Sequence, residues 1–121
     1  MLIAAYVLIA VVAVIHAYIV VLEMLLWQTP RARAAFGTSE ELAAQTATMA
    51  GNQGLYNGFL VAGLVVALIA GPTGAVGFAF AVFSLVCVIV AGLYGAATVS
   101  PRILLVPSVP AALALVATLL A

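Results

Sequence analysis

The chain alternates between long apolar runs and short polar breaks. Four stretches are apolar over most of their length, namely residues 2–27, 51–70, 74–99, and a last one that begins at 102 or 103 and continues to 121. A helix needs ~20 residues to cross the hydrocarbon core of a bilayer, and every backbone amide there must bond within its own segment. Strand-like alternation is missing from the runs. The pattern therefore predicts an all-α integral membrane protein with four spans.

The breaks predict how the spans follow one another. Residues 71–73 (Gly-Pro-Thr) are typical of a tight turn. Residues 100–101 (Ser-Pro) form the third break, and proline is favoured where a helix begins. Pro107 and Pro110 lie in the fourth run, where their missing N–H groups predict a kink or a delayed regular start. We expect a single domain, residues 1–121, folded as an up-down-up-down four-helix bundle.

The first break, residues 28–50, is the only long polar stretch. Thr38 and Glu41 have the spacing of a capping box, with Thr38 as the N-cap and Glu41 bonding back to it. Apolar Leu42 and Met49 follow at helical spacing. These features predict a short interfacial helix at the membrane surface. The pattern also allows this helix to continue into the second span.

Composition excludes several classes of function. Hydrophobic residues make up 69% of the chain and charged residues 5%, against ~25% charged residues in soluble domains. Three basic and three acidic residues, with a net charge of zero, provide neither a nucleic-acid surface nor the exterior of a soluble enzyme. The lipid bilayer is the expected partner. The single cysteine, Cys87, offers no intrachain disulfide.

The basic residues predict the orientation. Arg31 and Arg33 lie in the first break and Arg102 in the third, whereas the second break and both ends of the sequence contain neither lysine nor arginine. Basic residues favour the cytoplasmic side, so both termini are expected outside. Because no basic residue precedes the first run, we expect it to remain as a permanent span and not to be a cleaved signal peptide.

Small residues predict self-association. Gly54 with Gly58, and Ala91 with Gly95, are four residues apart, so each pair allows a close helix approach. One close helix–helix contact needs only one such face, and the chain has two. We expect a homo-oligomer, and both a dimer and a trimer are compatible with the pattern.

Glu23 and His16 are the ionisable residues within the spans, apart from tyrosines. A carboxylate at the centre of a membrane helix costs ~2.5–3.5 kcal/mol, but Glu23 lies one turn before Trp27, near the helix end. It either pairs with Arg31 or Arg33, or forms a ligand or proton site. His16 shares its helix face but lies ~10.5 Å away along the axis, so the two do not reach one metal ion. No metal site is expected.

Polar side chains gather at the start of the second span. Asn52 and Tyr56 are four residues apart, as are Gln53 and Asn57, so each pair lies on one helical stripe. They are either structural bonds between helices or the wall of a polar pocket that opens to the cytoplasm. The candidate ligand-binding residues are His16 as the floor, Glu23, Trp27, Asn52, Gln53, Tyr56, Asn57 and Tyr94.

Three stretches carry a resemblance to a protein family. They are residues 16–37 (HAYIVVLEMLLWQTPRARAAFG), 52–58 (NQGLYNG) and 87–102 (CVIVAGLYGAATVSPR). They resemble the small bacterial membrane-protein family DUF1304, a domain of unknown function. The resemblance implies a four-helix protein of the bacterial cytoplasmic membrane, and it names neither a cofactor nor a catalytic residue.

Two other four-span families are similar in architecture. Small multidrug-resistance transporters have a glutamate in the middle of the first span, whereas Glu23 lies near the helix end, and the one-sided arginines disfavour a dual-topology dimer. The membrane-associated eicosanoid and glutathione enzymes use several arginines with Asn, Glu and Tyr at inner helix ends. Here all three arginines lie in breaks, so only the architecture is similar.

Three functions are compatible with these residues. The favoured one is a non-catalytic protein that binds a small amphipathic molecule, a lipid or a partner helix at the inner polar cluster, because amides, tyrosines and a carboxylate suit neutral or cationic groups. A small-molecule or proton-coupled transporter would depend on His16, the only deep ionisable residue. A membrane enzyme would need an acid–base pair in contact, and His16 and Glu23 are ~10 Å apart. No cofactor is assigned.

Overall fold

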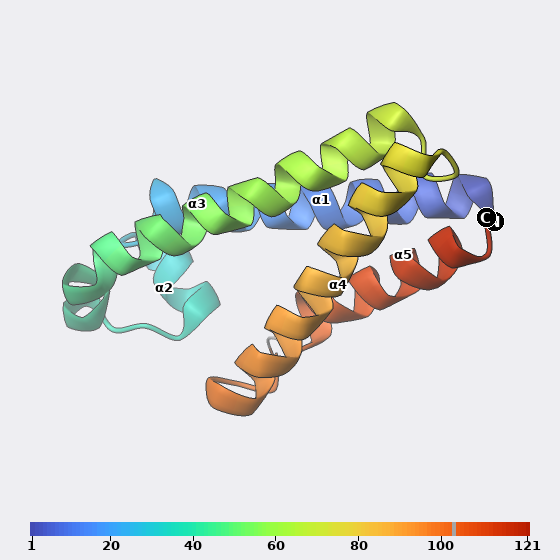
Figure 1. Ribbon diagram of the computed structural model, residues 1–121. Helices are drawn as coiled ribbons and strands as arrows, with labels where there is room; N and C mark the ends of the chain where they lie inside the picture. The colour runs from blue at the N-terminus through green and yellow to red at the C-terminus, as the bar shows by residue number, and fades with distance from the viewer. Residues whose placement is uncertain (103) are drawn as a thin grey trace.

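The computed structural model describes residues 1–102 and 104–121. This part of the chain is helical and contains no strand (Figure 1), which confirms the all-α prediction. The elements are α1 (Leu2–Met24), α2 (Pro30–Phe36), α3 (Glu40–Ala70), α4 (Ala75–Thr98), the π-helical segment η1 (Leu104–Ser108) and α5 (Val109–Leu119).

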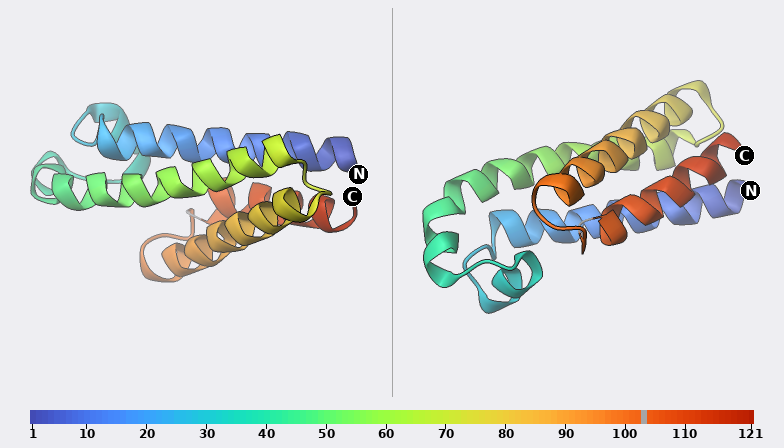
Figure 2. Two further views of the ribbon diagram at one scale, coloured as in Figure 1. Left: turned by 45° about the horizontal axis from the view of Figure 1, so that its top comes forward. Right: turned by 90° about the horizontal axis from the view of Figure 1, so that it is seen from below.

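Each of the long helices packs against two others. α1 packs along α3 and α5, and α4 packs against α3 and α5, so the order around the bundle is α1, α3, α4, α5. Figures 1 and 2 show the N- and C-termini together, at the end where α3 turns into α4. We call this the terminal end, and we call the opposite end, where α2 lies, the α2 end.

The apolar core is centred nearer the terminal end, and every long helix contributes to it. Half of its residues are alanines, which let helix axes approach closely, as helices that pack in lipid do. The core consists of Ile9, Val12, Ala13, Leu64, Ala67, Ala81, Leu85, Val88, Ala111 and Ala114.

Two glycines set the crossings of α4. Gly63 of α3 lies against the Ser84 hydroxyl, and Gly92 lies against the Ser108 hydroxyl of η1, so a Cβ at either glycine would overlap its neighbour. Ala91, which was predicted together with Gly95 to pack closely against another helix, is exposed. Gly92, the next residue along α4, makes the close contact within this chain.

The predicted turn between the second and third spans is present. Gly71 has a φ of +85°, a conformation that glycine adopts without the steric penalty of a side chain. Gly77 lies against the Gly71 carbonyl with no room for a Cβ. The turn brings α3 and α4 into contact side by side as antiparallel neighbours.

The first connection differs from the prediction. A short helix is present, but it is α2, whose N-cap Thr29 accepts a hydrogen bond from the Ala32 amide and is followed by proline. α3 then begins at Glu40 and is continuous to Ala70. Its N-cap is Ser39, which accepts from the Leu42 amide at 3.1 Å. The expected capping box on Thr38 is wrong, because with Ser39 as the cap Glu41 is one position too early to bond back.

The fourth run begins irregularly, as its prolines predict. Pro107 lies inside η1, and the regular helix α5 begins at Val109. A proline lacks the N–H that would bond four residues back, so the chain widens into a π-helical turn there. One of the two predicted starts, Ile103, lies outside the described residues.

Three helices are long and apolar enough to cross a membrane: Leu2–Met24, Glu40–Ala70 and Ala75–Thr98. A shorter apolar helical stretch, Leu105–Leu119, follows. Most large side chains outside the core are apolar and exposed in the single chain, which is the surface that a lipid environment requires. These features indicate a membrane protein.

Candidate functional site

Glu23 lies in the last turn of α1 and is the most buried charged residue described, with 1% of its surface exposed. The Gln53 side chain donates to one carboxylate oxygen at 2.7 Å, and the Asn57 side chain donates to the other at 2.8 Å. The two amides lie one turn apart on α3, so the predicted stripe is the one that faces Glu23. Both donors are neutral, and the negative charge is therefore bonded but not balanced.

Gly54 makes this geometry possible. A Cβ at position 54 would lie 2.5 Å from Met24 Cγ and 3.0 Å from Glu23 Cβ, which is closer than side chains pack. Glycine lets α3 approach the end of α1 until the neighbouring amides reach the carboxylate. At Gly58, a turn further along, nothing lies within 4 Å of the added Cβ.

A hollow of about 320 Å³ lies at the end of α1, and Glu23 is one of the residues that line it. Its lining consists of the chain from Glu23 to Thr29, with Ala47 of α3 opposite. The amides of Leu25 and Leu26 both donate to the Val21 carbonyl, at 3.0 and 3.1 Å, so the regular hydrogen-bond ladder of α1 ends at the rim of the hollow. The last carbonyls of a helix carry partial negative charge. The end of α1 beside the hollow therefore carries partial negative charge.

Trp27 forms one wall of the hollow. Its indole N–H donates to the Thr46 hydroxyl of α3 at 3.2 Å. The centroids of the Trp27 ring and the Phe36 ring of α2 lie 4.9 Å apart. These contacts fix the loop after α1 to both neighbouring helices. Trp27 is also the only tryptophan of the chain, so its fluorescence reports on this position alone.

The arginines do not neutralise Glu23. Arg31 donates to the Tyr18 hydroxyl at 3.4 Å, and the Nε of Arg33 is buried without a partner in the described chain. Both carboxylate oxygens of Glu23 are instead bonded to amides. The interfacial ion pair that was one interpretation of Glu23 is not formed.

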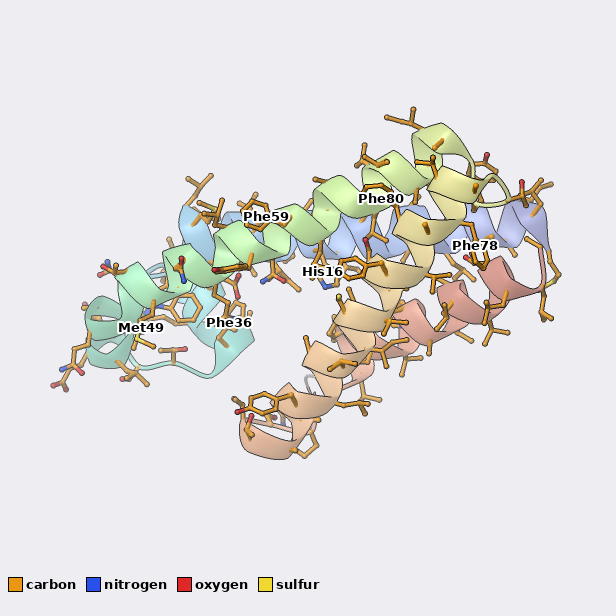
Figure 3. All side chains as sticks on the ribbon, in the orientation of Figure 1. His16, Phe36, Met49, Phe59, Phe78 and Phe80 are labelled. Atoms are coloured by element: carbon orange, nitrogen blue, oxygen red, sulfur yellow. The ribbon has the colours of Figure 1, made fainter. Side chains whose placement is uncertain are left out.

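His16 lies apart from this cluster. Its side chain is 4% exposed, and its Nδ1 bonds to the Val12 carbonyl of its own helix at 2.9 Å. Since a carbonyl only accepts, Nδ1 carries the proton. In Figure 3 His16 lies along the middle of the bundle, whereas Phe36 lies at the α2 end. His16 is not among the residues that line the hollow.

The predicted site residues thus divide into two groups. Glu23 is in contact with Gln53 and Asn57. Glu23 and Trp27 line the hollow, whereas Gln53 and Asn57 are not among its lining residues. The remaining predicted residues are not brought to this hollow within one chain: His16 is buried elsewhere, and Asn52, Tyr56 and Tyr94 are exposed.

Sequence reasoning missed the backbone that lines the hollow and gave Gly54 only a general packing role. Thr29 followed by Pro30 was an available signal, because a capping residue before a proline marks a helix start. This pattern predicts that the first span ends before residue 29 and that a compact loop lies beside Glu23.

The sequence model of one family, described as protein of unknown function (DUF1304), matches residues 10–119. The chain belongs to the DUF1304 family. The match confirms the resemblance carried by residues 16–37, 52–58 and 87–102. No curated protein and no solved structure matches the chain. Glu23, Gln53 and Asn57 all lie inside the DUF1304 match, which covers the bundle from α1 to α5.

Proposed function

We propose that the protein crosses the bacterial cytoplasmic membrane four times, as an up-down-up-down bundle of α1, α3, α4 and η1–α5. The position of both termini at one end of the bundle supports an even number of crossings. The fourth crossing, Leu105–Leu119, is ~22 Å long at 1.5 Å per residue. A bilayer accommodates a short crossing by thinning locally.

The α2 end is the cytoplasmic end in this proposal. Arg31 and Arg33 belong to α2, and Arg102 follows α4 at the end away from the termini. The positive-inside rule then places both termini outside. Alkaline phosphatase fused after residue 72 is expected to be active, and the same enzyme fused after residue 33 to be inactive; activity at residue 33 would overturn the orientation.

At this end the protein binds the head group of a small amphipathic molecule, and the observation that carries this function is the unbalanced carboxylate beside a hollow. A buried charge in a membrane protein costs several kcal/mol and marks a functional site by default. Two amides satisfy part of the hydrogen-bonding capacity of Glu23, but each carboxylate oxygen retains a lone pair. The 320 Å³ of the hollow is enough for a small head group.

The ligand's head group is a hydrogen-bond donor with positive charge. The carboxylate and the end of α1 both present acceptors, which repel a carboxylate or a phosphate. A primary ammonium has three N–H donors and balances the charge of Glu23. The apolar part of the ligand then extends along the exposed apolar helices into lipid.

Quenching of Trp27 tests this function. The probe is dodecylamine brominated at mid-chain, away from its amino group, added to the protein in nanodiscs, and it is expected to quench Trp27 fluorescence saturably. The dodecanol and dodecanoate of the same length and bromination are expected to quench at least tenfold more weakly, since each loses charge-assisted bonds worth ~1.5–3 kcal/mol. Equal quenching by all three compounds would refute the assignment. Equal quenching of wild type and of Glu23→Gln by the amine would refute it as well.

Self-association is part of the proposal. Nothing lies within 4 Å of a Cβ added at Gly58, and Asn52 and Tyr56 are exposed in the single chain. Small and polar residues on a lipid-facing surface favour contact with another helix. A mass measurement in detergent is expected to give a dimer or trimer, and a monomer at every concentration would contradict this.

A further inference from the structure

A second polar contact lies on the outer side of α1. Arg31 reaches back from α2 and donates to the hydroxyl of Tyr18 at 3.4 Å. Tyr18 is 46% exposed, and it lies six residues before the end of α1, ~9 Å along the axis. A guanidinium group is therefore held beside the lipid-facing side of a membrane helix, near the edge of the hydrocarbon.

No carboxylate of the described chain balances this charge. Both oxygens of Glu23 are bonded to amides, and Glu40 and Glu41 are exposed in the first turn of α3. The contact of Arg31 with a neutral hydroxyl is long, and it leaves most of the five guanidinium donors unused.

The two groups point to one kind of ligand. The Tyr18 oxygen accepts from Arg31, so its own O–H is free to donate to another oxygen nearby. Two donors, one of them cationic, then lie side by side, and the Tyr18 oxygen is the one acceptor that Arg31 contacts among the described residues. A tetrahedral phosphate oxygen suits this arrangement, since a guanidinium group binds phosphate through several N–H donors.

We propose that Arg31 and Tyr18 bind the phosphate group of an anionic phospholipid of the inner leaflet. The aromatic ring lies at head-group level, as tyrosines at membrane boundaries do, and the arginine adds the attraction between basic residues and anionic lipid. This site rests on the proposed membrane orientation but not on the Glu23 site, which has the opposite charge and faces another side of α1.

Native mass spectrometry of the protein released from nanodiscs tests the site. The bilayers contain equal amounts of phosphatidylglycerol and of diacylglycerol with the same acyl chains. Wild type is expected to retain phosphatidylglycerol preferentially. Arg31→Gln should lower its retention about tenfold and Tyr18→Phe about threefold, the range for a charge-assisted and a neutral hydrogen bond.

Arg102→Gln is the matched control, because it removes one exposed arginine at the same membrane face. It is expected to leave retention unchanged. Equal losses for Arg31→Gln and Arg102→Gln would show a general charge effect and overturn the site, as would retention unchanged by Arg31→Gln.

Inorganic phosphate distinguishes the source of the phosphate group. Millimolar phosphate should not displace the lipid, because the acyl chains hold it in place. Displacement by phosphate would overturn the lipid assignment in favour of a soluble phosphate ligand. Dodecylamine quenching of Trp27 should be unchanged in Arg31→Gln, so failure of this site and failure of the Glu23 site are distinguishable.

Discussion

The two ends of the bundle are held together by different interactions. Toward the terminal end, α1, α3, α4 and α5 pack mainly through alanines, leucines and valines, and the buried polar side chains described there are those of Ser84 and Thr118. Toward the α2 end, the contact between α1 and α3 is made by a buried carboxylate, two amides and a glycine. Helix packing at the terminal end depends on complementary shape, and helix packing at the α2 end depends on hydrogen bonds.

The difference separates stability from function. Apolar packing in lipid contributes through close contact and needs no charge. A carboxylate buried among neutral groups contributes little net stability, because its desolvation offsets its hydrogen bonds. Substitutions at the two ends should therefore have different consequences for unfolding and for ligand binding.

The largest loss of stability is expected from Leu85→Ala in the core. Leu85 is fully buried, and truncation leaves a cavity that lowers the free energy of unfolding by about 3 kcal/mol. Unfolding in mixed micelles by sodium dodecyl sulfate measures this, with Leu93→Ala on the exposed side of α4 as the control. Equal effects of both substitutions would contradict the assignment of the core.

Gly54→Ala should have an intermediate effect on stability and a large one on binding. The added methyl group meets Met24 and Glu23, so α3 shifts outward at a cost of about 1–2 kcal/mol, and the amides move away from the carboxylate. Gly51→Ala, where the space is open, is the matched control and should retain both stability and dodecylamine binding. If both variants bind as wild type does, the close approach at Gly54 is not part of the site.

Glu23→Gln should separate the two properties most clearly. Removing a buried charge while keeping the shape is expected to change the free energy of unfolding by less than about 1 kcal/mol. Dodecylamine binding, read from Trp27, should fall at least tenfold, since the charge-assisted bonds are lost. A large loss of stability with binding preserved would make Glu23 a structural residue.

The smallest effects are expected at the exposed tyrosines. Tyr56→Phe and Tyr94→Phe remove hydroxyl groups that have no contact with the Glu23 cluster, and both side chains are more than half exposed. Each should change stability by less than about 0.5 kcal/mol and leave dodecylamine binding unchanged. A strong loss of binding in either variant would contradict this and would indicate that the tyrosine of a neighbouring copy of the chain contributes to the binding site.

Two of the long apolar helices were predictable, because a run that is long and apolar enough to cross a bilayer also defines one helix. The predicted runs 2–27 and 74–99 agree with α1 and α4 within a few residues. The pairing of Gln53 with Asn57 was also predictable, because residues four apart share a helical stripe.

The contacts between helices were not predictable in the same way. Glu23 and His16 share one face by spacing, yet Glu23 meets polar groups of α3 whereas His16 bonds to a carbonyl of its own helix. Gly54 lets α3 approach α1 closely beside Glu23. Asn52 and Tyr56 form a stripe as regular as that of Gln53 and Asn57, but it lies on the exposed side. The periodicity of each helix can be inferred from a single sequence, but the rotation of one helix relative to another cannot.

The cap of α3 illustrates a finer limit. Thr38 and Ser39 are neighbours that can both cap a helix, with serine the better N-cap, and the choice also depends on the loop that precedes them. Gly37 ends α2 in a left-handed conformation with φ +66°, which sets the direction of the chain and leaves Ser39 at the start of α3.

The structure of the protein isolated with native lipid tests the Glu23 site most directly. We predict ordered density of a non-protein molecule in the hollow between residues 23–29 and Ala47, with a donor atom of its head group within hydrogen-bond distance of Glu23. A hollow closed by side chains of the protein, or an arginine from a neighbouring copy bound to the Glu23 carboxylate, would contradict the proposed binding site.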